Sequence, residues 1–150
     1  MDATAHETKL VWPGLRGFYD SFFDIAYTLM RVAIGYILFM HGWGKFHAGA
    51  GAIATNIMAK NGVEPALGFA YAAMALETVG AACIVIGLFT RFFAAAAAIE
   101  MLLITFVYWK TGFAWTRRGY EYTLMWGLIC FAIALRGGGA FYAAQQSRPG

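Results

Sequence analysis

The chain has 150 residues, of which 61% are hydrophobic and only 13% are charged. A soluble domain could not bury that much apolar surface, so a soluble globular fold is excluded and an integral membrane protein is indicated. The net charge of +3 comes from basic residues that are scattered singly near the ends of apolar runs. Such positions are typical of interfacial anchors, so no nucleic-acid partner is expected.

Apolar runs long enough to cross a bilayer, which takes roughly 20 residues per helix, follow a polar N-terminal segment. Residues 1–20 are predicted to form a polar arm at the membrane surface, and residues 137–150 a tail. The four spans are predicted at about 22–41, 66–88, 92–110 and 120–136. We therefore predict an all-α fold, a single transmembrane domain built as a four-helix bundle.

The longest connection, residues 42–65, joins the first two predicted spans. Ile53, Ile57 and Met58 have the spacing of a short interfacial helix within it. Four spans place both termini on one side of the lipid bilayer. Basic residues are divided nearly evenly between the two sides, and Lys9 and Arg16 favour cytoplasmic termini in the inner membrane.

Three ionisable residues fall near the middle of predicted spans: Arg31 in the first, Glu77 in the second and Glu100 in the third. A charge at the bilayer centre costs at least about 2.5 kcal/mol on insertion scales, so such residues are functional or paired. Equal depth predicts a direct or water-bridged contact between Arg31 and Glu77, with Glu100 close by. A purely structural ion pair is the alternative, and the sequence leaves both open.

Two helical faces combine small residues with charges. The first consists of Arg31, Gly35, Leu38, Gly42 and Lys45, and the second of Glu77, Gly80, Ile84, Gly87 and Arg91. Glycines on such faces let membrane helices approach closely. We predict that the two faces meet inside the bundle.

One rim of the bundle is predicted to hold His41, Lys45, Trp115, Arg117, Arg118 and Glu121. Its positive excess would attract an anionic headgroup, a sulfur oxyanion or a quinone head. The opposite rim should hold mainly structural Asp–Arg pairs, drawn from Asp20, Asp24, Arg91 and Arg136. His41 is interpreted either as a proton-handling group or as a hydrogen-bonded interfacial histidine, and two histidines without further ligands predict no metal site.

Four segments carry a family resemblance: RVAIGYILFMHGWGKF, LETVGAACIVIGLFTRFFA, GYEYTLMW and RGGG. Over about residues 27–139 the chain resembles the DoxX family of small four-helix membrane proteins. Matching positions are Arg31, Gly35, His41, Gly42, Lys45, Glu77, Gly80, Gly87, Leu88 and Arg91. The chain departs from the family at RGGGAFYAA, which replaces the usual GPG and Ser-Leu-Asp.

The family includes the membrane subunit of thiosulfate:quinone oxidoreductase and partners of other membrane redox complexes. The resemblance implies a membrane subunit of a quinone-linked oxidoreductase complex with a sulfur or thiol donor. The bundle would bind a lipophilic substrate such as quinone, with no covalently bound cofactor. The chain has no haem, flavin or iron–sulfur motif, so electrons would come from a redox partner subunit.

Quinone reduction consumes protons, so ionisable groups beside the ring are required. The predicted catalytic residues are Glu77, Glu100 and His41. The predicted substrate-binding residues are Arg31, Lys45, Arg91 and Glu121.

A noncatalytic role is the alternative. The chain would then be an assembly partner for another complex, or a protein that binds a lipid or another small lipophile. Its polar cluster would serve to fix the helix register. The sequence does not decide whether the chain is an enzyme, and it leaves a homo-oligomer open.

Overall fold

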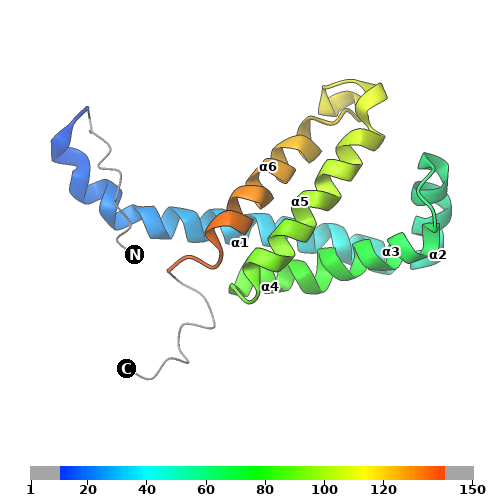
Figure 1. Cartoon of the computed structure of the whole chain (residues 1–150), viewed down its shortest axis with the longest axis horizontal. Coiled ribbons are helices and arrows are strands. Elements are labelled where there is room, and N and C mark those ends of the chain that lie inside the picture. The colour runs from blue at the N-terminus through cyan, green and yellow to red at the C-terminus, as the bar shows by residue number, and fades with distance from the viewer. Residues whose placement is uncertain (1–10, 141–150) are drawn as a thin grey trace.

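A computed structural model describes residues 11–140, which form helices and turns without a strand (Figure 1). Residues 1–10 and 141–150 lie outside the described residues, and with them half of the predicted arm and most of the predicted tail. Two helical hairpins make up the fold. The first pairs α1 with the helix that runs from α3 to α4, and the second pairs α5 with α6.

The first helix, α1 (Arg16–Ala48), is longer at both ends than the predicted span 22–41 and includes residues 16–20 of the predicted arm. It follows a 3-10 turn, Pro13–Leu15. The helix continues through Gly42 and Gly44 because an interior glycine weakens a helix by only about 1 kcal/mol, which tertiary packing overrides. It ends where Gly49 adopts a φ of 84°.

The second apolar helix runs antiparallel to α1 and is interrupted once. It consists of α3 (Ala66–Ala75), the π-helical turn η4 (Leu76–Gly80) and α4 (Ala81–Ile86). Its C-terminal cap is Gly87, whose φ of 82° lies in the left-handed region that glycine adopts without strain. The predicted span 66–88 ends two residues later.

The second hairpin consists of α5 (Thr90–Val107) and α6 (Glu121–Arg136). The hydroxyl groups of Thr105 and Thr123 lie 2.9 Å apart and join the two helices. Between the helices lie the 3-10 turns η5 (Trp109–Thr111) and η6 (Trp115–Arg117). These bounds lie within three residues of the predicted spans 92–110 and 120–136.

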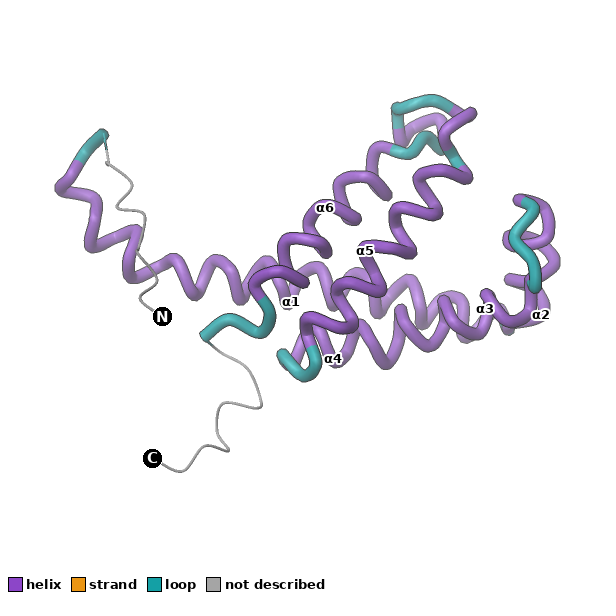
Figure 2. The backbone as a smooth tube through the Cα atoms, in the orientation of Figure 1, coloured by secondary structure: helices purple, strands orange, loops and turns teal. Residues whose placement is uncertain are grey.

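The long connection after α1 is largely helical (Figure 2). It contains α2 (Ala50–Ile53), the π-helical turn η2 (Ala54–Met58) and the 3-10 turn η3 (Ala59–Asn61). We call this segment the 50–61 helix. Its buried residues pack on α3 in a small core of Ala50, Ile53, Ala54 and Ala70. The predicted short helix is present, and its position relative to a membrane stays a prediction.

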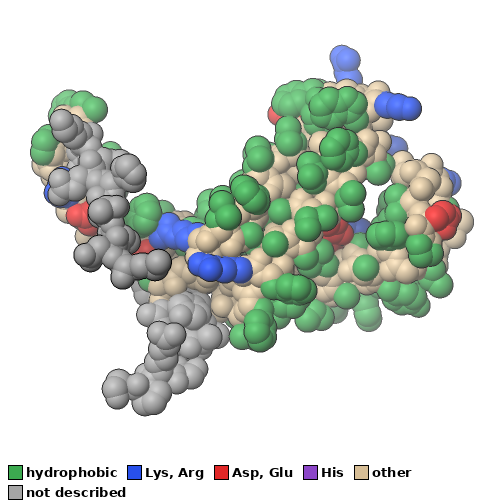
Figure 3. All heavy atoms as spheres, in the orientation of Figure 1, with side chains coloured by type: hydrophobic (Ala, Val, Ile, Leu, Met, Phe, Trp, Pro, Cys, Tyr) green, Lys and Arg blue, Asp and Glu red, His purple; other side chains and the backbone are tan. Residues whose placement is uncertain are grey.

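Among residues 11–140, three helices are long and apolar enough to cross a membrane: Pro13–Ala48, Ala66–Ile86 and Thr90–Val107. Residues buried between them include small ones, such as Ala81, Ala94 and Ala97. Large apolar side chains cover much of the outer surface (Figure 3). A small-residue interior under an apolar exterior suits a protein surrounded by lipid.

Candidate functional site

The contact between α1 and the second apolar helix sets the geometry of the site. An ideal Cβ placed on Gly42 would lie 2.5 Å from the carbonyl carbon of Glu77, and one on Gly35 would lie 2.8 Å from Cγ2 of Val85. Neither position has room for a larger residue. The prediction that the two glycine-bearing faces meet is confirmed for Gly42 against Glu77. A Cβ on Gly80 would instead meet Leu76 and Phe93, so this glycine faces α5.

This register places the Lys45 amine against the Glu77 carboxylate, and the two groups form an ion pair. The Glu77 side chain is 2% exposed and that of Lys45 is 21% exposed. Glu77 lies in the π-helical turn η4. Such turns are often found at functional sites, because the extra residue changes the direction of neighbouring side chains.

Arg31 lies elsewhere, at the end of the second apolar helix. Its Nη1 donates to the carbonyl oxygens of Ile84, at 2.5 Å, and Val85, at 2.7 Å. Carbonyls in the last turn of a helix lack intrahelical partners and carry partial negative charge, so a guanidinium stabilises them. The chemistry of this contact is that of a helix cap.

The predicted contact between Arg31 and Glu77 is therefore wrong, because Glu77 pairs with Lys45. Ile84 lies two helical turns beyond Glu77, roughly 10 Å along the axis. The physical reason is the length of α1. Because the helix continues to Ala48 instead of ending near residue 41, the antiparallel pairing is shifted and Glu77 faces the last turns of α1.

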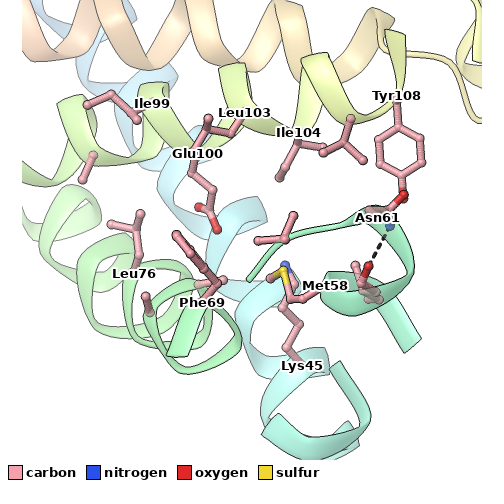
Figure 4. A pocket seen from close by; sticks show the side chains of 16 residues that line it. Lys45, Met58, Asn61, Phe69, Leu76, Ile99, Glu100, Leu103, Ile104 and Tyr108 are labelled. Carbon is pink, nitrogen blue, oxygen red and sulfur yellow. Dashed lines mark hydrogen bonds between the residues drawn. The ribbon is translucent and has the colours of Figure 1, made fainter. Parts of the chain in front are cut away.

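A cavity of about 360 Å³ lies beside the ion pair (Figure 4). Its walls come from α3, α5, the end of α1, and the 50–61 helix with the residues that follow it. The polar side chains in the lining belong to Lys45, Asn61, Glu100 and Tyr108. The remainder of the lining is apolar and includes Ile57, Met58, Val63, Phe69, Leu76, Ile99, Leu103, Ile104 and Val107.

Glu100 points from α5 into this cavity (Figure 4). Its Oε2 is buried and has no hydrogen-bond partner among residues 11–140. Glu77 and Lys45 are both close enough to interact with Glu100 electrostatically. Lys45, Glu77 and Glu100 form one charged group, which we call the cavity triad.

The other predicted site residues lie outside the cavity lining. His41 is exposed on α1, and Arg91 is exposed at the start of α5. Glu121, in the first turn of α6, accepts a hydrogen bond of 3.2 Å from the backbone N–H of Trp115. Of the predicted set, Glu77, Glu100 and Lys45 are brought together, whereas His41, Arg31, Arg91 and Glu121 are not.

Several cavity residues had no functional prediction from the sequence. Asn61 fell inside the predicted connection 42–65, and Tyr108 fell inside a predicted span. Asn61 Nδ2 donates to the carbonyl oxygen of Ile57 at 2.7 Å, which fixes the end of the 50–61 helix (Figure 4). A polar residue such as Tyr108 near the end of a span could have suggested a site. The cavity residues Ile57, Met58 and Asn61, however, belong to a segment far from Tyr108 in the sequence.

The comparison with family models gives a match to DoxX over residues 26–109, which is more than half of the chain. The chain belongs to the DoxX family. With three helices able to cross a membrane, this DoxX protein is an integral membrane protein. The matched region contains Lys45, Glu77 and Glu100 and ends before α6. No curated protein and no solved structure shows a significant match.

Proposed function

We propose that this DoxX protein is the membrane subunit of a quinone-linked oxidoreductase complex and that it binds the quinone head in the cavity. The observation that carries the proposal is the buried, unpartnered Oε2 of Glu100 in a largely apolar cavity shared with Lys45. An apolar pocket with a few convergent polar groups is the usual form of a site for a lipophilic ligand.

The size and lining of the cavity fit this ligand class. At about 360 Å³ it lies near the lower end of small-molecule sites, enough for a ring but not for a long isoprenoid tail. Aromatic and aliphatic side chains would contact the ring faces. Lys45 has three N–H donors and Glu77 uses one of them, so another can bind a quinone carbonyl oxygen.

The proposed chemistry is the conversion of quinone, two electrons and two protons to quinol. In this proposal a partner subunit with a sulfur or thiol donor supplies the electrons. Glu100 delivers a proton to the quinone oxygen, and the carboxylate of Glu77 holds the Lys45 amine in position. His41, on the exposed side of α1, is proposed to exchange protons with the aqueous edge.

The membrane arrangement follows from the same proposal. We infer that α6 forms a fourth span and that the 50–61 helix lies at one interface, in the inner membrane with cytoplasmic termini. With 16 residues, α6 is slightly shorter than the usual minimum for a span. It packs along α5 for most of its length, and Gly127 contacts Met101 at mid-helix.

Ligand binding by purified protein in lipid nanodiscs tests the proposal. The wild-type protein should bind ubiquinone or menaquinone, and Glu100→Leu should weaken binding roughly tenfold, because one hydrogen bond to a buried charged or polar group is lost. Glu121→Gln is the matched control, since this carboxylate lies outside the cavity. Failure of the wild type to bind either quinone would overturn the proposal.

The same experiment distinguishes the proposed quinone-binding subunit from the noncatalytic alternative, a lipid-binding protein. A cavity that serves only as a lipid site should retain phospholipid and should not exchange it for quinone. Mass spectrometry of the lipid extract from the purified protein distinguishes the two ligands. Quinone binding that Glu100→Leu leaves unchanged would place the quinone outside this cavity.

A further inference from the structure

Basic side chains gather at the end of the bundle where α1, the α4–α5 turn and the end of α6 meet (Figure 3). Nη2 of Arg136 lies 2.8 Å from Oδ1 of Asp24, which confirms the predicted Asp–Arg pairing at this rim. The Arg136 guanidinium also lies over two aromatic rings, 4.0 Å from the centroid of Tyr27 and 4.4 Å from that of Phe23. Arg136 is thus held in a fixed orientation.

The loop after α6 lies against a second arginine, Arg91, at the start of α5. The Tyr27 hydroxyl donates to the carbonyl oxygen of Gly137 at 2.5 Å, which ties this loop to α1. A Cβ on Gly137 would lie 2.9 Å from Nε of Arg91. Arg31, Arg91 and Arg136 are all close enough to Tyr27 to interact with it electrostatically. Three guanidinium groups therefore converge on one aromatic residue.

Among the described residues, the positive charge of Arg91 and Arg136 is only partly balanced. Asp24 forms an ion pair with Arg136, and Asp20 lies one turn earlier on α1 without a salt bridge to any described residue. Arg31 is buried at the end of α4, whereas Arg91 is exposed. The excess charge is thus presented at the surface, where a ligand can reach it.

The surroundings indicate a ligand that also has an apolar part. Phe89 and Phe92 are exposed beside Arg91 in the sequence, and Phe23, which is also exposed, lies under the Arg136 guanidinium. The helices α4 and α6 end here and α5 begins here. The ends of membrane-spanning helices commonly lie near the lipid headgroups. The planar fork of a guanidinium matches the oxygen atoms of a phosphate group.

We propose that Arg91 and Arg136 form a binding site for the phosphate of an anionic phospholipid, whose acyl chains pack along the exposed phenylalanines. Arg31 strengthens the positive field from inside the bundle. The site is separate from the cavity triad, and it does not depend on the proposed quinone function.

Lipid retention tests this site. The full chain is reconstituted in vesicles with equal parts phosphatidylcholine and phosphatidylglycerol, extracted in mild detergent, and examined by native mass spectrometry. The wild type should retain phosphatidylglycerol preferentially, and Arg91→Gln should lower that preference roughly fivefold. Arg136→Lys, which keeps the charge but loses the fork, should lower it less. Lys60→Gln, at an exposed position of the 50–61 helix, is the matched control and should leave it unchanged.

Three results would overturn the proposal. The first is a wild-type protein with no preference for phosphatidylglycerol over phosphatidylcholine. The second is an equal loss of preference in Arg91→Gln and Lys60→Gln, which would indicate a general charge effect. The third is displacement of phosphatidylglycerol by inorganic phosphate at equal concentration, which would mean that the site takes free phosphate and not a lipid headgroup.

Discussion

The backbone of Glu77 lies against Gly42, so that even one additional carbon atom on Gly42 would lie 2.5 Å from the Glu77 carbonyl. This contact brings two helices together at the position where Lys45 meets the Glu77 carboxylate. The packing of the bundle and the geometry of the cavity triad therefore depend on the same pair of residues.

Gly42→Ala should lower the free energy of unfolding by about 1 to 3 kcal/mol, as overpacked cores do. Gly44→Ala is the control, because a Cβ at that position meets nothing within 4 Å. Thermal unfolding in detergent compares the two variants. Equal stability of Gly42→Ala and Gly44→Ala would show that the two helices are not in this close contact.

Glu77→Gln should lower stability by about 3 to 5 kcal/mol, because it leaves the Lys45 amine without its partner in a largely buried position. The double variant Lys45→Met with Glu77→Leu should recover much of the loss, since both charges are then absent. Chemical denaturation of the single and double variants measures the coupling. A double variant no more stable than the single one would contradict a paired arrangement.

Asp24→Asn should have a much smaller effect on folding. The Asp24 and Arg136 side chains are 50% and 32% exposed, and ion pairs with that exposure contribute about 1 kcal/mol or less. The same chemical denaturation assay compares the stability of Asp24→Asn with that of Glu77→Gln. A loss as large as that of Glu77→Gln would show that the pair is buried in the membrane-embedded protein.

Cysteine accessibility tests the fourth span. In a background with Cys83→Ala and Cys130→Ala, single cysteines replace Trp12, Thr116 or Gly138. A membrane-impermeant maleimide should label Trp12→Cys and Gly138→Cys from the same side and Thr116→Cys from the other. Labelling of Gly138→Cys from the side of Thr116→Cys would mean that α6 does not cross the bilayer.

The sequence was sufficient to predict where the helices lie in the chain. It was not sufficient to predict the register in which α1 packs against the second apolar helix. Apolar runs located each helix to within a few residues except at α1, where the glycines of HGWGKFHAGAG suggested an early end. A glycine does not end a helix where close packing against a neighbouring helix stabilises it, as at Gly42. Composition alone does not distinguish a glycine that packs from one that ends a helix.

This single error changed the predicted partner of Glu77. The sequence identified Glu77 and Glu100 by their depth in apolar runs, and both are members of the cavity triad. Lys45 was expected at a rim, because a lysine after an apolar run usually faces water. Its inward position depends on the extended α1 and on the 50–61 helix, and such long-range packing leaves no periodic signal in the sequence.

The wall formed by Ile57, Met58 and Asn61 belongs to the connection between two helices and not to a helix of the bundle. The glycines that hold α1 against its neighbour lie on a different segment. Connections tolerate substitution and changes of length better than packed helices do. Ligand preference in this protein can therefore evolve through the 50–61 helix while the bundle and its cavity triad stay unchanged.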